Sequence, residues 1–183
     1  MKTEHALAKA LKEMMATRSL DDISVMEISK KCGVSRKTFY YHYHDIYDLL
    51  TQVFLDEKIP NLNNASNFEE LVTIIFTYYK KNEAFINATL DSAGKDLLSE
   101  FIYNAYYTTI IRFIVKVDTN KVLPIARRRS IARFYAYGYS ESMVYYLANH
   151  KNKTLEGLLS SFSFIKYKNF VKNLQNDIKE YEK

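Results

Sequence analysis

The chain has 183 residues, of which 48% are hydrophobic, which is ample for the core of one helical domain or of a small domain plus a larger one. Its single cysteine, Cys32, excludes an internal disulfide and a paired-cysteine metal site, and no apolar run approaches the ~20 residues of a membrane helix. The net charge of +5 suits a nucleic-acid partner, but residues 1–59 hold nine basic and nine acidic side chains, so the whole excess lies in residues 60–183. Because residues 1–13 are polar and charged, we expect no signal peptide and a cytoplasmic protein.

The N-terminal part of the chain predicts a series of short helices. The first opens at Thr3 or Glu4 and ends near Arg18, and its apolar face comprises Leu7, Ala10, Leu11, Met14 and Met15. Residues 19–22 form a loop, from which Ile23 packs onto the helices.

Residues 24–45, SVMEISKKCGVSRKTFYYHYHD, predict two short helices joined by a tight turn. Ser24 and Glu27 form a capping box at the start of the first: the serine oxygen accepts a backbone N–H, and the carboxylate reaches back to the cap. Gly33 follows the last apolar position, where a left-handed backbone costs glycine least. Ser35 then caps the second helix.

The second of these helices carries basic and hydrogen-bonding side chains on its first turns, while Phe39 and Tyr43 face inward. A helix, a glycine turn and a second helix with exposed donors at its start is the helix-turn-helix design, whose second helix enters the DNA major groove N-terminus first. Arginine and lysine there can read guanine, and tyrosine or histidine can reach phosphates or bases. An ordinary helical hairpin with a polar second helix is the alternative. The candidate DNA-binding residues are Ser24, Ser35, Arg36, Lys37, Thr38, Tyr40, Tyr41, His42 and His44.

Residues 26–43, MEISKKCGVSRKTFYYHY, resemble the DNA-binding signature of TetR-type transcriptional regulators, in which a GVS turn precedes a T-[LF]-Y-x-[HY]-[FY] recognition helix. The resemblance implies an all-helical homodimer that binds an inverted-repeat operator in double-stranded DNA and senses a small molecule in its C-terminal domain. In that family a lysine often opens the fourth helix and holds a phosphate, whereas this chain has Ile46 there. Either His44 or Tyr40 takes over that contact, or one phosphate contact is lost.

A domain boundary is predicted just after the fourth helix. Asp45 caps that helix, which we expect to continue to about Lys58, and Pro60 with the polar run after it ends the helix. Residues 1–59 then form the helix-turn-helix domain, with a linking helix over residues 46–59. Residues 60–183 form a larger helical bundle for effector binding and dimerisation.

The C-terminal part predicts only helices, since no run alternates convincingly at period two, and the fold class is therefore all-α. The expected segments are a helix capped by Asn67 with Glu70 at the capping-box position, then residues 83–90, 95–117, Pro124 to about Asn149, and Thr154 to about Tyr181 with a candidate break near Lys166.

Aromatic side chains are dense in this C-terminal part, and two interpretations remain open. One is an aromatic-lined cavity that binds an apolar or aromatic effector. The other is a packed core with tyrosines at its wet edge. The candidate ligand-binding residues are Tyr78, Phe101, Tyr106, Phe113, Phe134 and Tyr135.

The last two long helical segments are candidates for a dimer interface, because small residues on the first allow close approach of helices and a palindromic operator requires a two-fold protein. The alternative is that these helices close the monomer core. The candidate interface residues are Tyr135, Gly138, Tyr139, Ser142, Leu158, Phe162 and Ile165.

Catalysis has no support in the sequence. The four histidines do not form a spaced metal set, no serine lies in a nucleophile elbow, and a chain with four glycines lacks a phosphate loop of the usual form. We therefore expect no metal, no cofactor and no enzyme. The basic run from Arg127 to Arg133 is interpreted as a solvated face paired with Glu141 or Asp118. A helical protein-interaction module with a vestigial helix-turn-helix is the alternative function, and a small-molecule enzyme is a distant third.

Overall fold

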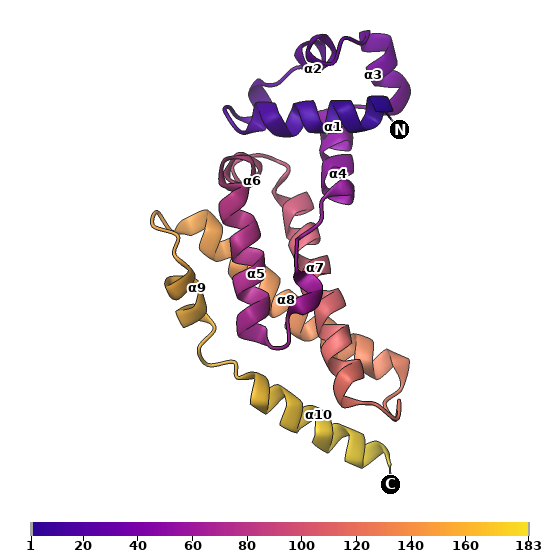
Figure 1. Ribbon diagram of the computed structural model, residues 1–183, viewed down its shortest axis with the longest axis vertical. Helices are drawn as coiled ribbons and strands as arrows, with labels where there is room; N and C mark the ends of the chain where they lie inside the picture. The colour runs from indigo at the N-terminus through magenta and orange to yellow at the C-terminus, as the bar shows by residue number, and fades with distance from the viewer. Residues whose placement is uncertain (1, 183) are drawn as a thin grey trace. The chain divides into compact units, whose positions relative to one another are not determined.

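The computed structural model describes residues 2–182, and within that range the chain is helical with no strand (Figure 1). The all-α prediction is confirmed. The α-helices are α1 Lys2–Met15, α2 Val25–Lys31, α3 Arg36–His42, α4 Ile46–Asp56, α5 Phe68–Lys81, α6 Glu83–Leu90, α7 Lys95–Val117, α8 Ile125–Asn149, α9 Leu155–Ser161 and α10 Tyr167–Tyr181, and the 3-10 turns are η1 Leu20–Asp22 and η2 Leu62–Asn64.

The chain packs as two compact units. The first consists of the residues up to Lys58 together with Tyr79–Phe101, and the second consists of Ile59–Tyr78 together with the residues from Ile102 on. Helix α6 therefore packs with the N-terminal helices. The functional division at residues 59 and 60, into a DNA-binding and an effector-binding domain, stays a prediction, because packing alone does not test what either part binds.

The first unit is built around α1, which contacts α2, α4 and α6. The Lys12 side chain on α1 donates a hydrogen bond to the Glu57 carboxylate and lies 5.4 Å from the ring centroid of Phe85 on α6. A close approach also joins α4 to the turn before α7: a Cβ added at Gly94 would lie 2.5 Å from the Leu50 side chain. The fully buried side chains of this unit include Leu7, Leu11, Met15, Leu20, Ile28, Phe39, Leu49 and Leu50.

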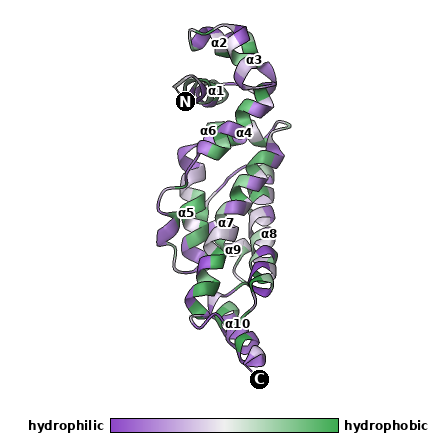
Figure 2. Cartoon of the chain, turned by 90° about the vertical axis from the view of Figure 1, so that its right-hand side faces the viewer, coloured by the Kyte–Doolittle hydropathy of each residue, from purple (hydrophilic) through white to green (hydrophobic). Residues whose placement is uncertain are grey.

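The second unit is centred on an aromatic cluster around Phe68, at the start of α5. Its ring centroid lies 4.9 Å from that of Tyr139, 5.1 Å from that of Phe170 and 5.9 Å from that of Phe113. Figure 2 shows apolar residues interleaved with polar ones along α5 and α7, as amphipathic helices require. The aromatic cluster thus joins α5, α7, α8 and α10.

Several helix boundaries differ from the predicted ones by a few residues. Helix α1 ends at Met15 instead of near Arg18, and α4 ends at Asp56 instead of near Lys58 because Glu57 adopts an extended backbone. Pro124 is the N-cap of α8 and lies outside the helix. The predicted break near Lys166 is confirmed: α9 and α10 are separate helices in Figure 1.

The side chains of Asp118 and Arg112 hold two loops of the second unit. Asp118, buried in the loop after α7, accepts hydrogen bonds from the backbone N–H groups of Val122 at 2.8 Å and Leu123 at 3.2 Å, and from Arg128 Nε at 2.9 Å. The Arg112 guanidinium on α7 donates to the carbonyls of Leu62 and Asn63 in η2. The segment that follows the linking helix is thereby held on α7.

Candidate nucleic-acid interface

Helix α2 begins with the predicted capping box. Ser24 Oγ accepts the Glu27 N–H at 3.3 Å, the Ser24 N–H donates to Glu27 Oε2 at 2.9 Å, and the Ser24 hydroxyl donates to the same oxygen at 2.7 Å. Arg18 donates to the other carboxylate oxygen at 2.9 Å. Hydrogen bonds from the Ser24 hydroxyl and N–H, followed by the one from Arg18, lower the pKa of Glu27 to about 2. The Ser24 hydroxyl is thus engaged in the cap, and its role toward DNA stays a prediction.

The turn between α2 and α3 is a Schellman motif. The Gly33 N–H donates to the Lys30 carbonyl at 3.2 Å, and the Val34 N–H donates to the Ser29 carbonyl at 3.0 Å. Gly33 has φ +66°, the left-handed conformation expected from its place in the sequence. These two bonds set the direction in which the chain leaves α2 and therefore the direction of α3.

Helix α3 is capped at its start, buried along one face at Phe39 and exposed along the opposite face. Ser35 Oγ accepts the Thr38 N–H at 3.0 Å, and Phe39 is fully buried. Tyr40 is 50% exposed and Tyr41 is 84% exposed. Two adjacent exposed aromatic side chains fit a face that a partner covers.

The charges around α3 divide into paired and unpaired cations. Lys31 Nζ lies 3.0 Å from Glu13 Oε2 and thereby forms an ion pair with α1. Lys30, Arg36 and Lys37 are exposed, and among residues 2–182 no acidic group lies within ion-pairing distance of them. The Arg36 guanidinium lies 6.0 Å from the Tyr40 ring centroid, one turn along the helix. Three unpaired cations therefore surround the start of α3, where DNA would meet it.

The two histidines of the candidate set differ in their surroundings. His42 Nδ1 lies 3.4 Å from Glu4 Oε1, so its ring is directed to α1, a contact that no local sequence pattern signals. His44 is exposed, and its backbone N–H donates to Asp48 at 3.0 Å. Ile46, half-buried, opens α4 where the family often has lysine. Of the replacements considered from the sequence, His44 and Tyr40 both keep exposed side chains.

The candidate ligand-binding residues have different surroundings within the two units. Phe101 packs on Phe54 in the first unit, with ring centroids 5.3 Å apart. Tyr106, which is fully buried, donates to the Met143 sulfur at 3.6 Å, and Phe113 lies 5.2 Å from the Tyr167 ring centroid. Tyr78 is buried, whereas Phe134 is 76% exposed and Tyr135 is half-buried. Their role in ligand binding stays a prediction.

Five of the seven candidate dimer residues line one apolar groove of about 650 Å³ in the second unit: Tyr135, Gly138, Tyr139, Ser142 and Ile165. Phe134 and Phe164 form part of the same wall, and Phe164 is 78% exposed. Sequence reasoning missed Phe164, because a single aromatic residue in a helix break carries no periodic signal. Leu158 and Phe162 are buried instead in the core of the unit.

The described residues offer neither a metal cluster nor a membrane-spanning helix. Among residues 2–182 no cluster of three or more His, Cys, Asp or Glu side chains has the arrangement of a metal site. No helix in the same range combines the length and the apolar character that crossing a membrane demands.

Comparisons with known proteins assign the chain to a family. Residues 7–53 match the model of bacterial regulatory proteins of the tetR family, and residues 66–165 match the model of a transcriptional regulator C-terminal region. The solved structure of the dihydroxyacetone kinase operon activator DhaS has a TM-score of 0.59 and 20% identity, covering 97% of this chain and 96% of that one, so the two share a fold.

Curated relatives agree with this assignment. The HTH-type dhaKLM operon transcriptional activator DhaS of Lactococcus lactis subsp. lactis (strain IL1403) is 26% identical over 86 residues, 45% of this chain and 46% of that protein. The uncharacterized HTH-type transcriptional regulator YwcC of Bacillus subtilis (strain 168) is 27% identical over 135 residues, 72% of this chain and 56% of that protein. The matches span about half the length of these relatives. With a helix-turn-helix in its N-terminal part and family models matched in both parts, the chain belongs to the TetR family of transcriptional regulators.

Proposed function

We propose that the chain binds an inverted-repeat operator as a homodimer, with α3 in the major groove of each half-site. The observation that carries the proposal is the start of α3, where Lys30, Arg36 and Lys37 are unpaired among the described residues and Tyr40 and Tyr41 are exposed. Cations without acidic partners keep their full charge for phosphates and guanine edges. The Ser24–Glu27 cap and the backbone hydrogen bonds of the Gly33 turn hold this surface in place.

A second copy of the chain is the occupant that we propose for the groove on α8. Phe134, Gly138 and Tyr145 are exposed at helical spacing on one face of α8, with Tyr137 beside them. A Cβ added at Gly138 would meet nothing within 4 Å, so within the chain the glycine fills no packing role. An apolar helix face with a gap at its centre suits close approach of the same face of a partner, and an inverted repeat requires that two-fold arrangement.

Control by a small molecule follows from a shift between populations of the dimer. An effector that binds one spacing of the two recognition helices more tightly than another changes the fraction of protein that fits both half-sites. The relatives named DhaS are described as activators. For this chain we propose operator binding and its modulation by an effector.

The test measures fluorescence anisotropy of duplex DNA from the region flanking the gene, at several salt concentrations. Arg36→Ala should cost about 1–3 kcal/mol at the cognate base pair and relax sequence preference. Arg129→Ala on α8 removes the same charge from another exposed position and serves as the control. Equal losses in the two variants would mean that only net charge matters, which would contradict readout by α3.

Two further substitutions separate the roles within α3. Tyr40→Phe removes a neutral hydroxyl, so binding to all sequences should weaken alike with an almost unchanged salt slope. Lys37→Ala distinguishes a base reader, whose loss alters preference, from a phosphate contact, whose loss lowers the salt slope by about one. If all three α3 variants fold and bind like the unmodified chain, the helix-turn-helix does not bind DNA, and a protein-interaction role replaces the proposal.

A further inference from the structure

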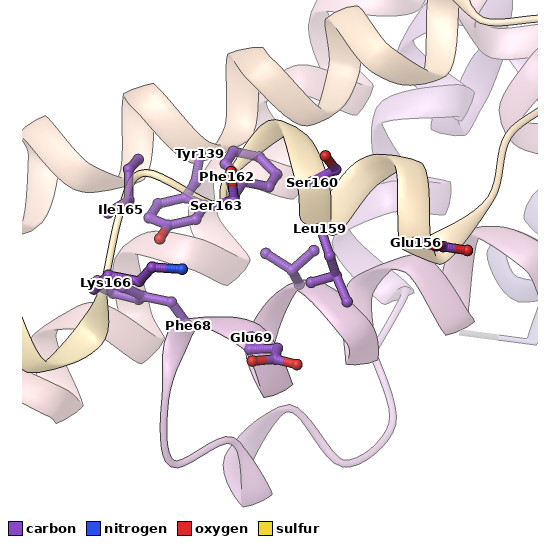
Figure 3. A pocket seen from close by; sticks show the side chains of 11 residues that line it. Phe68, Glu69, Tyr139, Glu156, Leu159, Ser160, Phe162, Ser163, Ile165 and Lys166 are labelled. Carbon is purple, nitrogen blue, oxygen red and sulfur yellow. The ribbon is translucent and has the colours of Figure 1, made fainter.

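A further pocket of the second unit lies beside the groove on α8. Its volume is about 370 Å³, within the range of small-molecule sites. Figure 3 shows its lining, which comes from the start of α5, from α8 and from α9 with the residues that follow it: Phe68, Glu69, Val72, Tyr139, Glu156, Leu159, Ser160, Phe162, Ser163, Ile165 and Lys166. None of the six residues expected from the sequence to bind a ligand is among them.

The feature that distinguishes this pocket is the phenol of Tyr139. Tyr139 is only 1% exposed, and its hydroxyl has no hydrogen-bond partner among the residues that the structure describes. In Figure 3 the hydroxyl end of Tyr139 is directed toward the side of the pocket where Lys166 lies. A buried hydroxyl without a partner is costly, so the site favours a molecule that supplies an acceptor. Burial raises the pKa of this hydroxyl, which therefore remains a neutral donor.

The charges of the pocket are arranged unevenly. Lys166 has no ion pair within residues 2–182, and its exposed side chain can move aside to admit a ligand atom to the Tyr139 hydroxyl. Figure 3 places Glu156 at the opposite end of the pocket from Lys166, with Glu69 between them. One end thus offers two donors, Phe68, Val72 and Leu159 supply apolar lining, and Glu69 and Glu156 make the rest of the rim acidic. A single carboxylate at the Lys166 end lies nearest the cation, whereas a second negative charge on the ligand would lie nearer the two glutamates and be repelled more strongly.

We propose that this pocket binds a small monocarboxylate with an apolar or aromatic body, whose carboxylate accepts hydrogen bonds from the Tyr139 hydroxyl and the Lys166 ammonium. The apolar body would rest on Phe68 and Leu159, which line the pocket, and would contact the aromatic cluster around Phe68.

The position of the pocket couples it to the groove on α8. Tyr139, Ile165 and Lys166 line both the pocket and the groove. A carboxylate that fixes Tyr139 and Lys166 therefore changes the wall against which a second copy of the chain would pack. This step rests on the proposed function, in which the groove is the dimer face and the protein responds to an effector.

The test uses isothermal titration of the full chain with 3-phenylpropanoate and, as matched probes, its neutral amide and the corresponding amine. The unmodified chain should bind the carboxylate, and the amide should bind at least about tenfold more weakly because a charged acceptor is lost. Tyr139→Phe should weaken carboxylate binding about tenfold or more, and Lys166→Met about threefold. Tyr106→Phe is the control: it removes another buried hydroxyl, one that is bonded to Met143 and lies outside the pocket.

Thermal unfolding of each variant checks that it folds. Tyr139→Phe should fold, because it keeps the ring that packs on Phe68. Tighter binding of the amine than of the carboxylate would show that the acidic rim determines the charge of the ligand, and would overturn the proposal. Loss of carboxylate binding in Tyr106→Phe but not in Tyr139→Phe would also overturn it. The same conclusion would follow if the carboxylate did not bind up to millimolar concentration. Anisotropy of operator DNA without any probe is measured in parallel, so a failed ligand proposal with intact DNA binding leaves the proposed function standing.

Discussion

At the scale of single residues, one backbone angle directs the recognition helix. Gly33 has φ +66°, and a Cβ there would meet no atom within 4 Å, so the cost of a side chain is purely conformational. Gly33→Ala should lower the free energy of unfolding by about 1 kcal/mol, measured by urea denaturation. Gly33→Asn should lose clearly less, because asparagine tolerates the left-handed region. Equal losses in the two variants would mean that crowding and not φ limits this position.

The Glu27 carboxylate makes a pH-dependent contribution to the stability of the cap at the start of α2. Its pKa falls from 4.5 to about 2 on folding, so its stabilisation is fully present above the unfolded pKa and disappears as the pH falls through the folded one. Glu27→Gln should therefore unfold at lower denaturant concentration than the unmodified chain at pH 7. The difference between the two should shrink between about pH 4 and pH 2. A difference independent of pH would show that the shape of the cap, and not its charge, matters.

Local patterns were enough to predict these positions. Ser24 with Glu27, the glycine at the end of α2 and the cap at Ser35 each depend on neighbours within a few residues, and the structure has all three. The contact of His42 with Glu4 joins positions far apart in the chain, and the sequence carries no local signal for it. The sequence likewise carries no local signal for the unpartnered Tyr139 hydroxyl, because its lack of a partner results from the packing of three separate helices.

At the scale of elements, the loop between α7 and α8 depends on a buried ion pair. The Asp118 and Arg128 side chains are 1% and 14% exposed, whereas the similar pair of Arg127 with Asp177 is 49% and 13% exposed. Asp118→Asn should cost about 3–5 kcal/mol of unfolding free energy, because it leaves a largely buried guanidinium without its partner. Asp177→Asn, the matched control, should cost at most about 1 kcal/mol. Similar costs in denaturant melts would contradict the assigned difference in burial.

The element boundaries show what periodicity does and does not predict. The bounds of α6 and α7 follow from caps and breaks within the sequence, and the structure has them as predicted. The early end of α4 depends on the extended backbone at Glu57, whose carboxylate is bonded to Lys12 on α1. The packing of α6 with the N-terminal helices likewise comes from tertiary contacts with α1. Such contacts between distant segments cannot be derived from spacing along one chain.

At the scale of the whole molecule, binding to an inverted repeat requires association through α8 in the proposed dimer. Light scattering should give twice the 21.5 kDa chain mass at micromolar concentration. Gly138→Trp should shift the mass toward one chain without lowering the melting temperature of the monomer, because open space surrounds this position within the chain. Gly157→Ala, where a Cβ would lie 2.5 Å from the Tyr146 hydroxyl, should instead destabilise the monomer. A dimer that persists in Gly138→Trp would place the interface elsewhere.

The most direct test of sequence-specific binding by α3 is selection of bound duplexes from a random DNA pool. We expect enrichment of an inverted repeat whose half-sites lie about one helical turn or a multiple of it apart, around 10 bp or its multiples. The same selection with Arg36→Ala should change the preferred base at one position of each half-site and leave the spacing unchanged. Recovery of unenriched DNA by the folded, unmodified dimer would contradict sequence-specific binding by α3.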